Sequence, residues 1–392
     1  MVADPRAPGV TADTIKIGLP WVDLSAIKDV INLDNGDTVK AYQAIFDDIN
    51  AKGGIHGRKL EPVFVPVNPV GTAAADAACT KLTQDDPVFL AVGFFLGDAV
   101  LCYVDTNETA VIGGNMTADA LAKAKAPWFS VDPSEEIEAE VVRAQAKAGK
   151  LSGKVAVVAA AANRQVLDGL VQPVLDEEGI EPVASAILDA PPSDPAATLA
   201  AAQTIAEKFK SAGAEKVLVV GQSGPPSLLP GLAKTDFRPE LLFSNQSGAL
   251  GFASAAGNDL TLLKGAVTGG LFGPDDDRFA LAGPTKDCLE IERKAGLEIE
   301  RPSEVVKGQP NQFLSSAPAC TQMALVEALL QKAGPDLDYG TLLAAGNGLG
   351  SVTLPGFPDP FTFGPAPHSD GDPKIYVFTW DAAKADFVRR DA

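Results

Sequence analysis

Histidines are few in this chain, and the sequence motifs of enzyme active sites are absent or incomplete. Its two histidines, His56 and His368, fall in a predicted turn and a predicted loop, and neither has a nucleophile near it in the pattern. The run Gly-Gln-Ser-Gly-Pro at 221–225 begins like a nucleophile elbow but ends in proline. The run Gly-Asn-Gly-Leu-Gly at 346–350 does not follow a strand that opens a βαβ unit, so we predict a loop and not a dinucleotide fingerprint. We therefore predict no catalytic residues, no cofactor and no enzyme activity.

Metal and thiol chemistry also have little support. The three aspartates at 275–277 lack the spaced oxygen ligands of a calcium loop, so we predict a solvated loop there and no metal site. None of the four cysteines forms a C-x-x-C pair. Cys79 and Cys102 lie in predicted helices on either side of one predicted strand, and we predict a disulfide between them. We predict a second disulfide between Cys288 and Cys320. Four buried free thiols are the alternative, because sequence alone does not fix connectivity.

Composition limits the class of protein. The chain has 392 residues, which suits two domains of comparable size, and 46 % of them are hydrophobic, enough for two cores. Its 51 acidic and 32 basic residues give a net charge of −19. Such a surface repels phosphate backbones and anionic lipid, so we expect no nucleic-acid partner. No segment is expected to cross a membrane.

The elements that would hold a site follow from periodicity. Within residues 37–52, apolar side chains recur at helical spacing: Val39, Tyr42, Phe46 and Ile49. Gly53 and Gly54 predict the helix end, and 60–67 alternates as a strand. With the predicted strand 14–20 this makes a βαβ unit, which requires a parallel sheet.

The same alternation continues along the chain. It predicts helix 72–84, strand 88–93, helix 98–107, strand 110–113, a short helix from 117 and strand 128–131. A helix at 134–150 precedes a second series, with strands 154–162, 181–187, 216–221, 240–244 and 266–272 and helices 166–178 and 196–213. Later helices are predicted at 283–296 and 310–334. The fold class is therefore α/β with doubly wound, mainly parallel sheets, and ligands are expected at the carboxyl ends of the strands.

Three stretches carry a family resemblance. GVTADTIKIG at 9–18, INAKGGIHGRKLE at 49–61 and KLTQDDPVFLAVG at 81–93, in this order and spacing, resemble the type I periplasmic binding proteins of the leucine/isoleucine/valine-binding family. These proteins are the extracytoplasmic substrate-binding subunits of ATP-driven importers. The resemblance implies two hinged lobes that capture a small organic ligand, with ABC permease subunits as partners.

The resemblance also implies how the lobes are assembled. One lobe would hold 1–132 and 275–347, and the other 133–274 and 348–392, joined by three crossings near 131–134, 273–277 and 346–350. Periodicity by itself suggests two consecutive domains instead. The C-terminal segments 361–363 and 374–380 are predicted to form an edge hairpin.

Ligand chemistry follows from comparison with the amino-acid-binding members. Their carboxylate clamp uses a serine, where this chain has Gly97, and a threonine that matches Thr117. Their acidic residue for the ligand ammonium is replaced by Gln246, and two aromatic positions correspond to Asn163 and Gly224. A glutamine cannot neutralise a buried ammonium. We therefore favour a neutral or carboxylate-bearing ligand, including aromatic compounds, over an amino-acid-like one.

The candidate ligand-binding residues come from both predicted lobes. The polar contacts are Asn115, Thr117, Asn163, Gln222, Ser223 and Gln246. Apolar walls are expected from Trp21, Phe94 and Phe95, and backbone N–H groups at Gly97, Asp98 and Thr117 are expected to face an anion at a helix N-terminus. The bland alternatives are core packing for the aromatic side chains and helix capping for Thr117 and Ser223.

The location follows only from the resemblance. It implies an extracytoplasmic protein, in the periplasm or as a lipoprotein at the cell surface, that acts as a monomer. The polar leader VADPRAPG after Met1 contains no export signal, so we expect that the signal has been removed and that Met1 is an added start. Two other classes stay open: the ligand-binding domain of a sensory receptor, and a Rossmann-type enzyme, although 20–26 offers no glycine for a cofactor loop.

Overall fold

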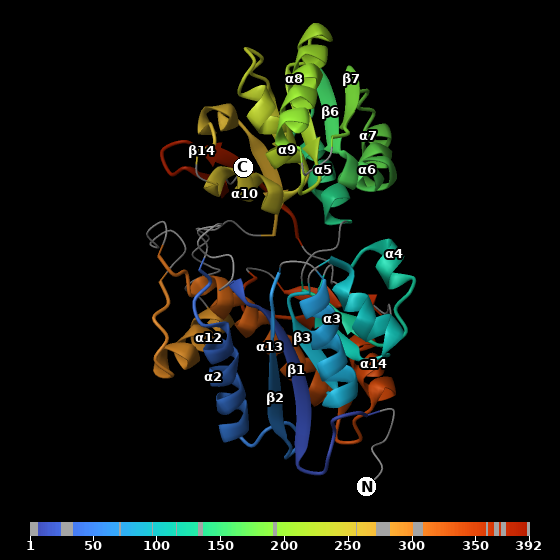
Figure 1. Ribbon diagram of the computed structural model, residues 1–392, viewed down its shortest axis with the longest axis vertical. Coiled ribbons are helices and arrows are strands. Elements are labelled where there is room, and N and C mark those ends of the chain that lie inside the picture. Colours follow the sequence, from blue (N-terminus) through green and yellow to red (C-terminus); the bar gives the residue numbers. More distant parts are fainter. Residues whose placement is uncertain are drawn as a thin grey trace. The chain divides into compact units, whose positions relative to one another are not determined.

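The chain forms two compact units, each made of separated segments. Unit 1 comprises Met1–Ser134 and Asp275–Pro373, and unit 2 comprises Glu135–Pro274 and Lys374–Ala392. The computed structural model describes residues 7–24, 34–69, 72–95, 97–114, 116–131, 136–190, 194–255, 257–271, 283–300, 309–357, 360–363, 368–369 and 374–389. Figure 1 shows both units as sheets flanked by helices, which confirms the α/β fold class.

Unit 1 is built on a six-stranded sheet in the order β13-β5-β4-β3-β1-β2. Its strands are β1 (Thr14–Val22), β2 (Lys59–Val67), β3 (Leu90–Gly93), β4 (Ala110–Gly113), β5 (Trp128–Phe129) and β13 (His368–Ser369). All described pairings in it are parallel. Every residue of β3 and β4 is buried, because helices cover both faces of a parallel sheet.

The predicted first βαβ unit is present. Asp37 caps α2 (Thr38–Ala51) by accepting a hydrogen bond from the Lys40 N–H. Of the predicted apolar face, Tyr42, Phe46 and Ile49 are buried and Val39 is half-buried. At the other end Gly54 has φ +69°, and a Cβ there would lie 2.0 Å from the Arg58 carbonyl oxygen. Glycine is therefore required for the close approach of α2's end to the start of β2.

Further helices complete unit 1. They are α3 (Ala73–Thr80), the π-helical turns η2 (Lys81–Asp85) and η4 (Cys102–Thr106), the 3-10 turn η3 (Gly97–Ala99), α4 (Ala118–Leu121), α12 (Gly283–Lys294), α13 (Phe313–Ala333) and α14 (Tyr339–Asn347). Contrary to expectation, α13 is long and apolar enough to cross a membrane by length and composition alone. Its apolar stretch is 72 % buried inside the protein and packs on α2 and α14, which is the environment of a core helix.

Two disulfides join helices of unit 1. Cys79 is bonded to Cys102, with 6.3 Å between the Cα atoms, and Cys288 is bonded to Cys320, with 5.8 Å between the Cα atoms. These are the two predicted pairs.

Unit 2 is built on a seven-stranded sheet in the order β15-β14-β10-β9-β8-β6-β7. The strands are β6 (Val155–Ala160), β7 (Ala184–Leu188), β8 (Lys216–Val220), β9 (Glu240–Phe243), β10 (Val267–Gly270), β14 (Tyr376–Asp381) and β15 (Asp386–Arg389). The pairings of β14 with β10 and β15 are antiparallel, and those between β6, β7, β8, β9 and β10 are parallel.

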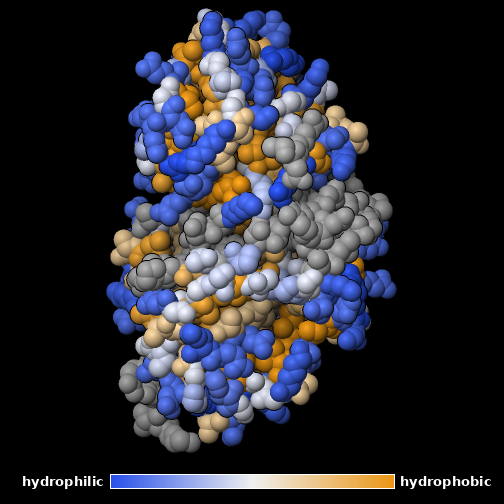
Figure 2. All heavy atoms as spheres, turned by 180° about the vertical axis from the view of Figure 1, so that it is seen from behind, coloured by the Kyte–Doolittle hydropathy of each residue, from blue (hydrophilic) through white to orange (hydrophobic). Residues whose placement is uncertain are grey.

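Helices pack on both faces of this second sheet. They are α5 (Ile137–Lys147), η5 (Ala161–Asn163), α6 (Arg164–Val166), η6 (Leu167–Val171), α7 (Gln172–Glu177), α8 (Pro195–Ser211), α9 (Gly224–Leu232), α10 (Gln246–Ser254) and the 3-10 turn η7 (Leu260–Leu263). Along β8, Val217 and Val219 join the core cluster under α8, α9 and α10, whereas Leu218 and Val220 join the cluster under α5 and α7. The apolar run of β8 is thus buried on both sides. Seen from behind the view of Figure 1, the surface of the protein is mostly hydrophilic, with hydrophobic residues in patches between the hydrophilic ones (Figure 2).

The C-terminal tail from residue 348 differs from the arrangement predicted from sequence. The predicted hairpin between 361–363 and 374–380 is wrong, because β12 (Phe361–Phe363) pairs antiparallel with β11 (Gly350–Val352). The tail was expected to enter the second lobe at 348, yet residues up to Pro373 belong to unit 1, where β13 extends the first sheet beside β5. The expected first two crossings, apart from Val131, and the predicted helix start at 134 lie outside the described residues.

Candidate ligand-binding site

The carboxyl edge of unit 1 is shaped by two glycines. Gly93 and Gly113 end β3 and β4 with φ values of +146° and +111°. A Cβ at Gly93 would lie 2.7 Å from the Pro20 carbonyl oxygen, and one at Gly113 would lie 2.2 Å from the Gly93 carbonyl oxygen. Only glycine therefore lets the chain leave these neighbouring strands so close together.

The aromatic candidates of unit 1 divide into two environments. Phe94 directly follows β3 and is 62 % exposed, whereas Phe95 is 5 % exposed and packs edge-on against Tyr103, with ring centroids 5.2 Å apart. Burial raises the pKa of the Tyr103 hydroxyl well above its ordinary value. Trp21 is half-buried near the end of β1. The structure thus leaves Phe94 as the aromatic side chain that solvent reaches most freely, and it places Phe95 in the core.

The polar candidates of unit 1 sit on short helices. Thr117 precedes α4, and its Oγ1 accepts a hydrogen bond from the Ala120 N–H at 3.2 Å, so the side chain caps the helix as the alternative assignment proposed. A hydroxyl that accepts one bond can still donate another. Gly97 and Asp98 are exposed in η3, which is three residues long and has little dipole to offer an anion. Asn115 lies outside the described residues.

In unit 2, Asn163 braces the loop that leads into α9. Its Oδ1 accepts a hydrogen bond from the Ser223 N–H at 3.2 Å. A Cβ at Gly221, where φ is +82°, would lie 2.2 Å from Asn163 Cγ. The side chain thus positions the loop, in which Gln222 is exposed and Ser223 half-buried.

Glu138 is a buried residue that the sequence interpretation missed. Its carboxylate accepts hydrogen bonds from the Gly221 N–H at 3.0 Å, from the Ser244 hydroxyl, and from Asn245 Nδ2 at 3.0 Å. It therefore holds the loops after β8 and β9 in a fixed position. The signal was available: Glu138 is three residues before Val141 on the apolar face of α5, where an acidic residue signals burial with partners.

Gln246 is the first residue of α10. The helix is capped by Asn245, whose Oδ1 accepts from the Gly248 N–H at 2.9 Å. The Gln246 amide packs over the backbone of Gly270, where a Cβ would lie 1.9 Å from its Oε1. The position predicted to face the ligand ammonium therefore presents a half-buried amide fixed between α10 and β10.

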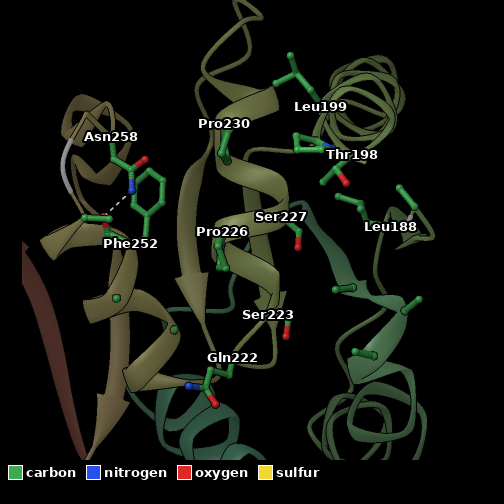
Figure 3. A pocket seen from close by; sticks show the side chains of 18 of the residues that line it. Leu188, Thr198, Leu199, Gln222, Ser223, Pro226, Ser227, Pro230, Phe252 and Asn258 are labelled. Atoms are coloured by element: carbon green, nitrogen blue, oxygen red, sulfur yellow. Dashed lines mark hydrogen bonds between the residues drawn. The ribbon is translucent and has the colours of Figure 1, made fainter. Parts of the chain in front are cut away.

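Gln222 and Ser223 open onto a cavity of about 1130 Å³ that lies entirely within unit 2. Figure 3 shows α9 in the middle of the view, with Leu188, Thr198 and Leu199 on one side and Phe252 and Asn258 on the other. The cavity is lined by Ala160, Ala161, Ala162, Leu188, Asp189, Ala190, Pro195, Thr198, Leu199, Gln222, Ser223, Pro226, Ser227, Pro230, Ser247, Gly248, Gly251, Phe252, Ala255 and Asn258. Of these residues, only Gln222 and Ser223 were predicted from sequence. The sequence did contain one signal: GPPSLLPGL at 224–232 has three prolines, which is unusual for a helix.

One cluster elsewhere has metal-ligand residue types. The sulfurs of Cys288 and Cys320 and a carboxylate oxygen of buried Glu292 lie within 4.8 Å of one another. Because the two sulfurs are bonded to each other, they are not the thiolates that metals bind. Burial raises the pKa of Glu292 from 4.5 to about 7.

Similar structures share this fold over nearly the whole chain. A substrate-binding protein of an ABC transporter from Desulfitobacterium hafniense, in complex with Leu, has 16 % identity and a TM-score of 0.67, with 96 % of this chain and 100 % of that chain covered. A solute-binding protein from R. palustris in complex with 4-hydroxybenzoate has 15 % identity, a TM-score of 0.66, and coverage of 97 % and 96 %. A fatty acid ABC transporter substrate-binding protein from Thermomonospora curvata has 17 % identity, a TM-score of 0.63, and coverage of 98 % and 93 %.

Sequence comparison gives the family. No curated protein matches the chain. The family model described as "Periplasmic binding protein" matches residues 14–385, which include all the described candidate residues. This chain therefore belongs to the periplasmic binding protein family, as the sequence resemblance indicated.

Proposed function

We propose that this protein is the substrate-binding subunit of an ABC importer and acts outside the cytoplasmic membrane. The observation that carries the proposal is the family match over residues 14–385. Similar folds, at low identity, belong to ABC transporter proteins solved with Leu or with 4-hydroxybenzoate. The chain delivers its ligand to permease subunits and works as a monomer.

Binding proceeds by a shift between open and closed forms. A ligand that contacts the carboxyl edges of both units at once stabilises the closed form relative to the open one, since those contacts do not all exist when the units are apart. Phe94 and Thr117 supply the contacts of unit 1. Gln222, Ser223 and Gln246 supply those of unit 2.

The charge of the ligand follows from the side chains that stand at the family's ligand-binding positions in this chain. Gln246 offers an amide where an ammonium would need a carboxylate. The Glu138 carboxylate accepts three hydrogen bonds from the protein itself, so it is engaged in holding loops. A neutral or carboxylate-bearing ligand fits this set better than a free amino acid.

A thermal-shift screen tests the function. Branched amino acids, aromatic acids, amides, small dicarboxylates and neutral amphiphiles are compared with NAD and nucleotides. A ligand at a hundred times its dissociation constant adds about 2.7 kcal/mol to the free energy of unfolding. We expect at least one organic solute to raise the melting temperature, and no nucleotide to do so. A shift with NAD alone would contradict the proposal.

The best binder is then measured with two matched variants. Phe94→Ala removes an exposed ring after β3, and we expect it to weaken binding about fivefold, which corresponds to about 1 kcal/mol for an aromatic contact. Val183→Ala removes another exposed apolar side chain, 40 % exposed at the amino end of β7, and should leave affinity unchanged. Equal effects of the two variants would remove Phe94 from the site.

A further inference from the structure

The cavity of unit 2 is larger than a small acid needs. Its volume is about 1130 Å³, slightly above the roughly 300 to 1,000 Å³ of most ligand pockets. Along α9 it extends from Ser223 to Pro230, seven residues or about 10 Å of helix. A ligand that uses this space must have an extended body.

Polar and apolar groups are unevenly placed along the cavity. Gln222 and Ser223 lie at the amino end of α9, and Figure 3 shows Pro226, Ser227 and Pro230 successively further along the helix. The side walls contributed by other elements include the hydrocarbon side chains of Leu188, Leu199 and Phe252. Thr198 and Asn258 add polar groups to these walls, and the Asn258 amide donates a hydrogen bond to the Phe252 carbonyl at 2.8 Å. The lining therefore suits a molecule with a polar group at one end and an apolar chain beyond it.

The polar end is poorly equipped to hold an anion. Helix α9 begins Gly224-Pro225-Pro226, so two of the first three residues lack the N–H groups that a helix N-terminus offers to negative charge. The N-terminus of α10 is capped by Asn245. Among the described lining residues none is basic, and Asp189 is the single acidic one.

Uncharged hydrogen-bonding groups are present instead. Ser223 and Ser227 are half-buried one turn apart on α9. Because Pro230 has no N–H, the helix cannot supply the usual i+4 donor to the Pro226 carbonyl. Hydroxyl and carbonyl groups therefore lie beside exposed proline rings, an arrangement that accepts and donates hydrogen bonds without charge.

We propose that unit 2 binds the alkyl chain of an uncharged amphiphile, with the chain along α9 and its hydroxyl or carbonyl head at Gln222 and Ser223. This inference rests on the proposed solute-binding function and narrows its ligand class. Unit 2 would then determine which alkyl-chain lengths the protein binds.

Isothermal titration with a monoacylglycerol series tests the inference. Monobutyrin, monocaprylin and monocaprin share one neutral head, and each is used below its critical micelle concentration. Each added methylene that becomes buried should tighten binding about fourfold, because burying one methylene contributes about 0.8 kcal/mol. Sodium octanoate, with an anionic head, should bind more weakly than monocaprylin. Affinity that does not depend on chain length would overturn the inference.

Two glycine substitutions test where the alkyl chain of the ligand binds. Gly251 lines the cavity on α10, and a Cβ there would have no atom within 4 Å, so Gly251→Phe places a ring in the cavity without a clash at its Cβ. Gly169 on η6 has equally open space around it but does not line the cavity, so Gly169→Phe is the matched control. We expect Gly251→Phe to weaken monocaprin at least tenfold and Gly169→Phe to leave it unchanged. Circular dichroism verifies that both variants fold.

The outcomes separate this inference from the proposed function. If a short acid or amino acid binds wild type and Gly251→Phe alike while monocaprin does not bind, the inference fails and the solute-binding function stands. If monocaprin binds both glycine variants equally, its alkyl chain lies outside this cavity and the inference also fails. If no solute in the screen or the series binds, both fail.

Discussion

The two units hold their carboxyl edges in place by different means. Unit 1 contains all four cysteines of the chain, joined as two disulfides between its helices, and its edge ends in short turns beside an exposed phenylalanine. Unit 2 contains no cysteine, and its edge loops are held by hydrogen bonds that their N–H groups donate to the Glu138 carboxylate and to Asn163 Oδ1. Covalent bonds stabilise the helices of unit 1, whereas in unit 2 the stabilising groups contact the loops that we propose to bind ligand. Stability and ligand recognition should therefore be separable in unit 1 and coupled in unit 2.

Reducing both disulfides should have the largest effect, confined to unit 1. The bridged residues are separated by 23 and 32 positions, and loops of this size contribute about 3 to 4 kcal/mol each, mainly through the unfolded chain. We expect the Cys79→Ser/Cys102→Ser/Cys288→Ser/Cys320→Ser variant to lose about 7 kcal/mol of unfolding free energy in unit 1.

Hydrogen exchange with mass spectrometry checks this unit by unit. Protection should fall in β1, β3 and β4 and stay unchanged in β6 and β8. A parallel loss in unit 2 would show that the two units unfold together and would break the comparison.

Replacing Glu138 should have the next largest effect, this time in unit 2. Glu138→Ala leaves the donors of Gly221, Ser244 and Asn245 without this acceptor. At about 1 to 3 kcal/mol per buried group, we expect a loss of at least roughly 3 kcal/mol in urea denaturation. Ligand affinity should fall with it, because the same loops carry Gln222 and Gln246.

The neighbouring Glu140 supplies the control for Glu138. It is exposed on the same helix and paired with Arg143 at the surface. Glu140→Ala should cost less than about 1 kcal/mol. If the two variants were equally stable, the buried carboxylate would have no special role in holding the edge.

The smallest expected effect is the pH dependence of stability, and it again concerns one unit only. Burial raises the pKa of Glu292 in unit 1 from 4.5 to about 7, so the folded protein binds this proton more tightly than the unfolded chain. The sign follows from linkage: the contribution to stability is fully present below pH 4.5 and is lost as pH rises towards 7, a total of about 3 kcal/mol at ~1.4 per pKa unit.

Glu292→Gln should remove this pH dependence. Urea unfolding of unit 1 between about pH 3.5 and about pH 8, which extends about one unit beyond each of the two pKa values, measures the slope in wild type and variant. Glu290→Gln, at an exposed position of the same helix, is the control and should keep the wild-type slope. An unchanged slope in Glu292→Gln would assign the pH dependence to another group.

Local pattern predicted the elements of both units well because it reflects local physics. Apolar spacing placed α2 and the glycines that end it, since helical periodicity and left-handed φ values are properties of a few neighbouring residues. Family resemblance supplied the assembly of each unit from separated segments. Whether Thr117, Gln222, Ser223 and Gln246 contact ligand stays a prediction.

The same local pattern failed to select the strand partner. The segment 361–363 alternates like an edge strand, and only the structure shows that it pairs with Gly350–Val352 instead of 374–380 and that both strands belong to unit 1. A strand by itself does not specify its neighbour, because any sheet edge offers the same backbone groups.

The sequence by itself determined the alternation of strands and helices, the acidic composition and the resemblance to periplasmic binding proteins. It also showed that Gly97 stands where the family has a ligand-binding serine and that Gln246 stands where it has an acidic residue. Only the tertiary structure decided that Glu138 is buried under two loops and that Leu188, Leu199 and Phe252 surround α9 to form a cavity. The physical reason is that side-chain type and spacing act within a few residues, whereas burial and cavity shape depend on residues that the fold brings together from far along the chain.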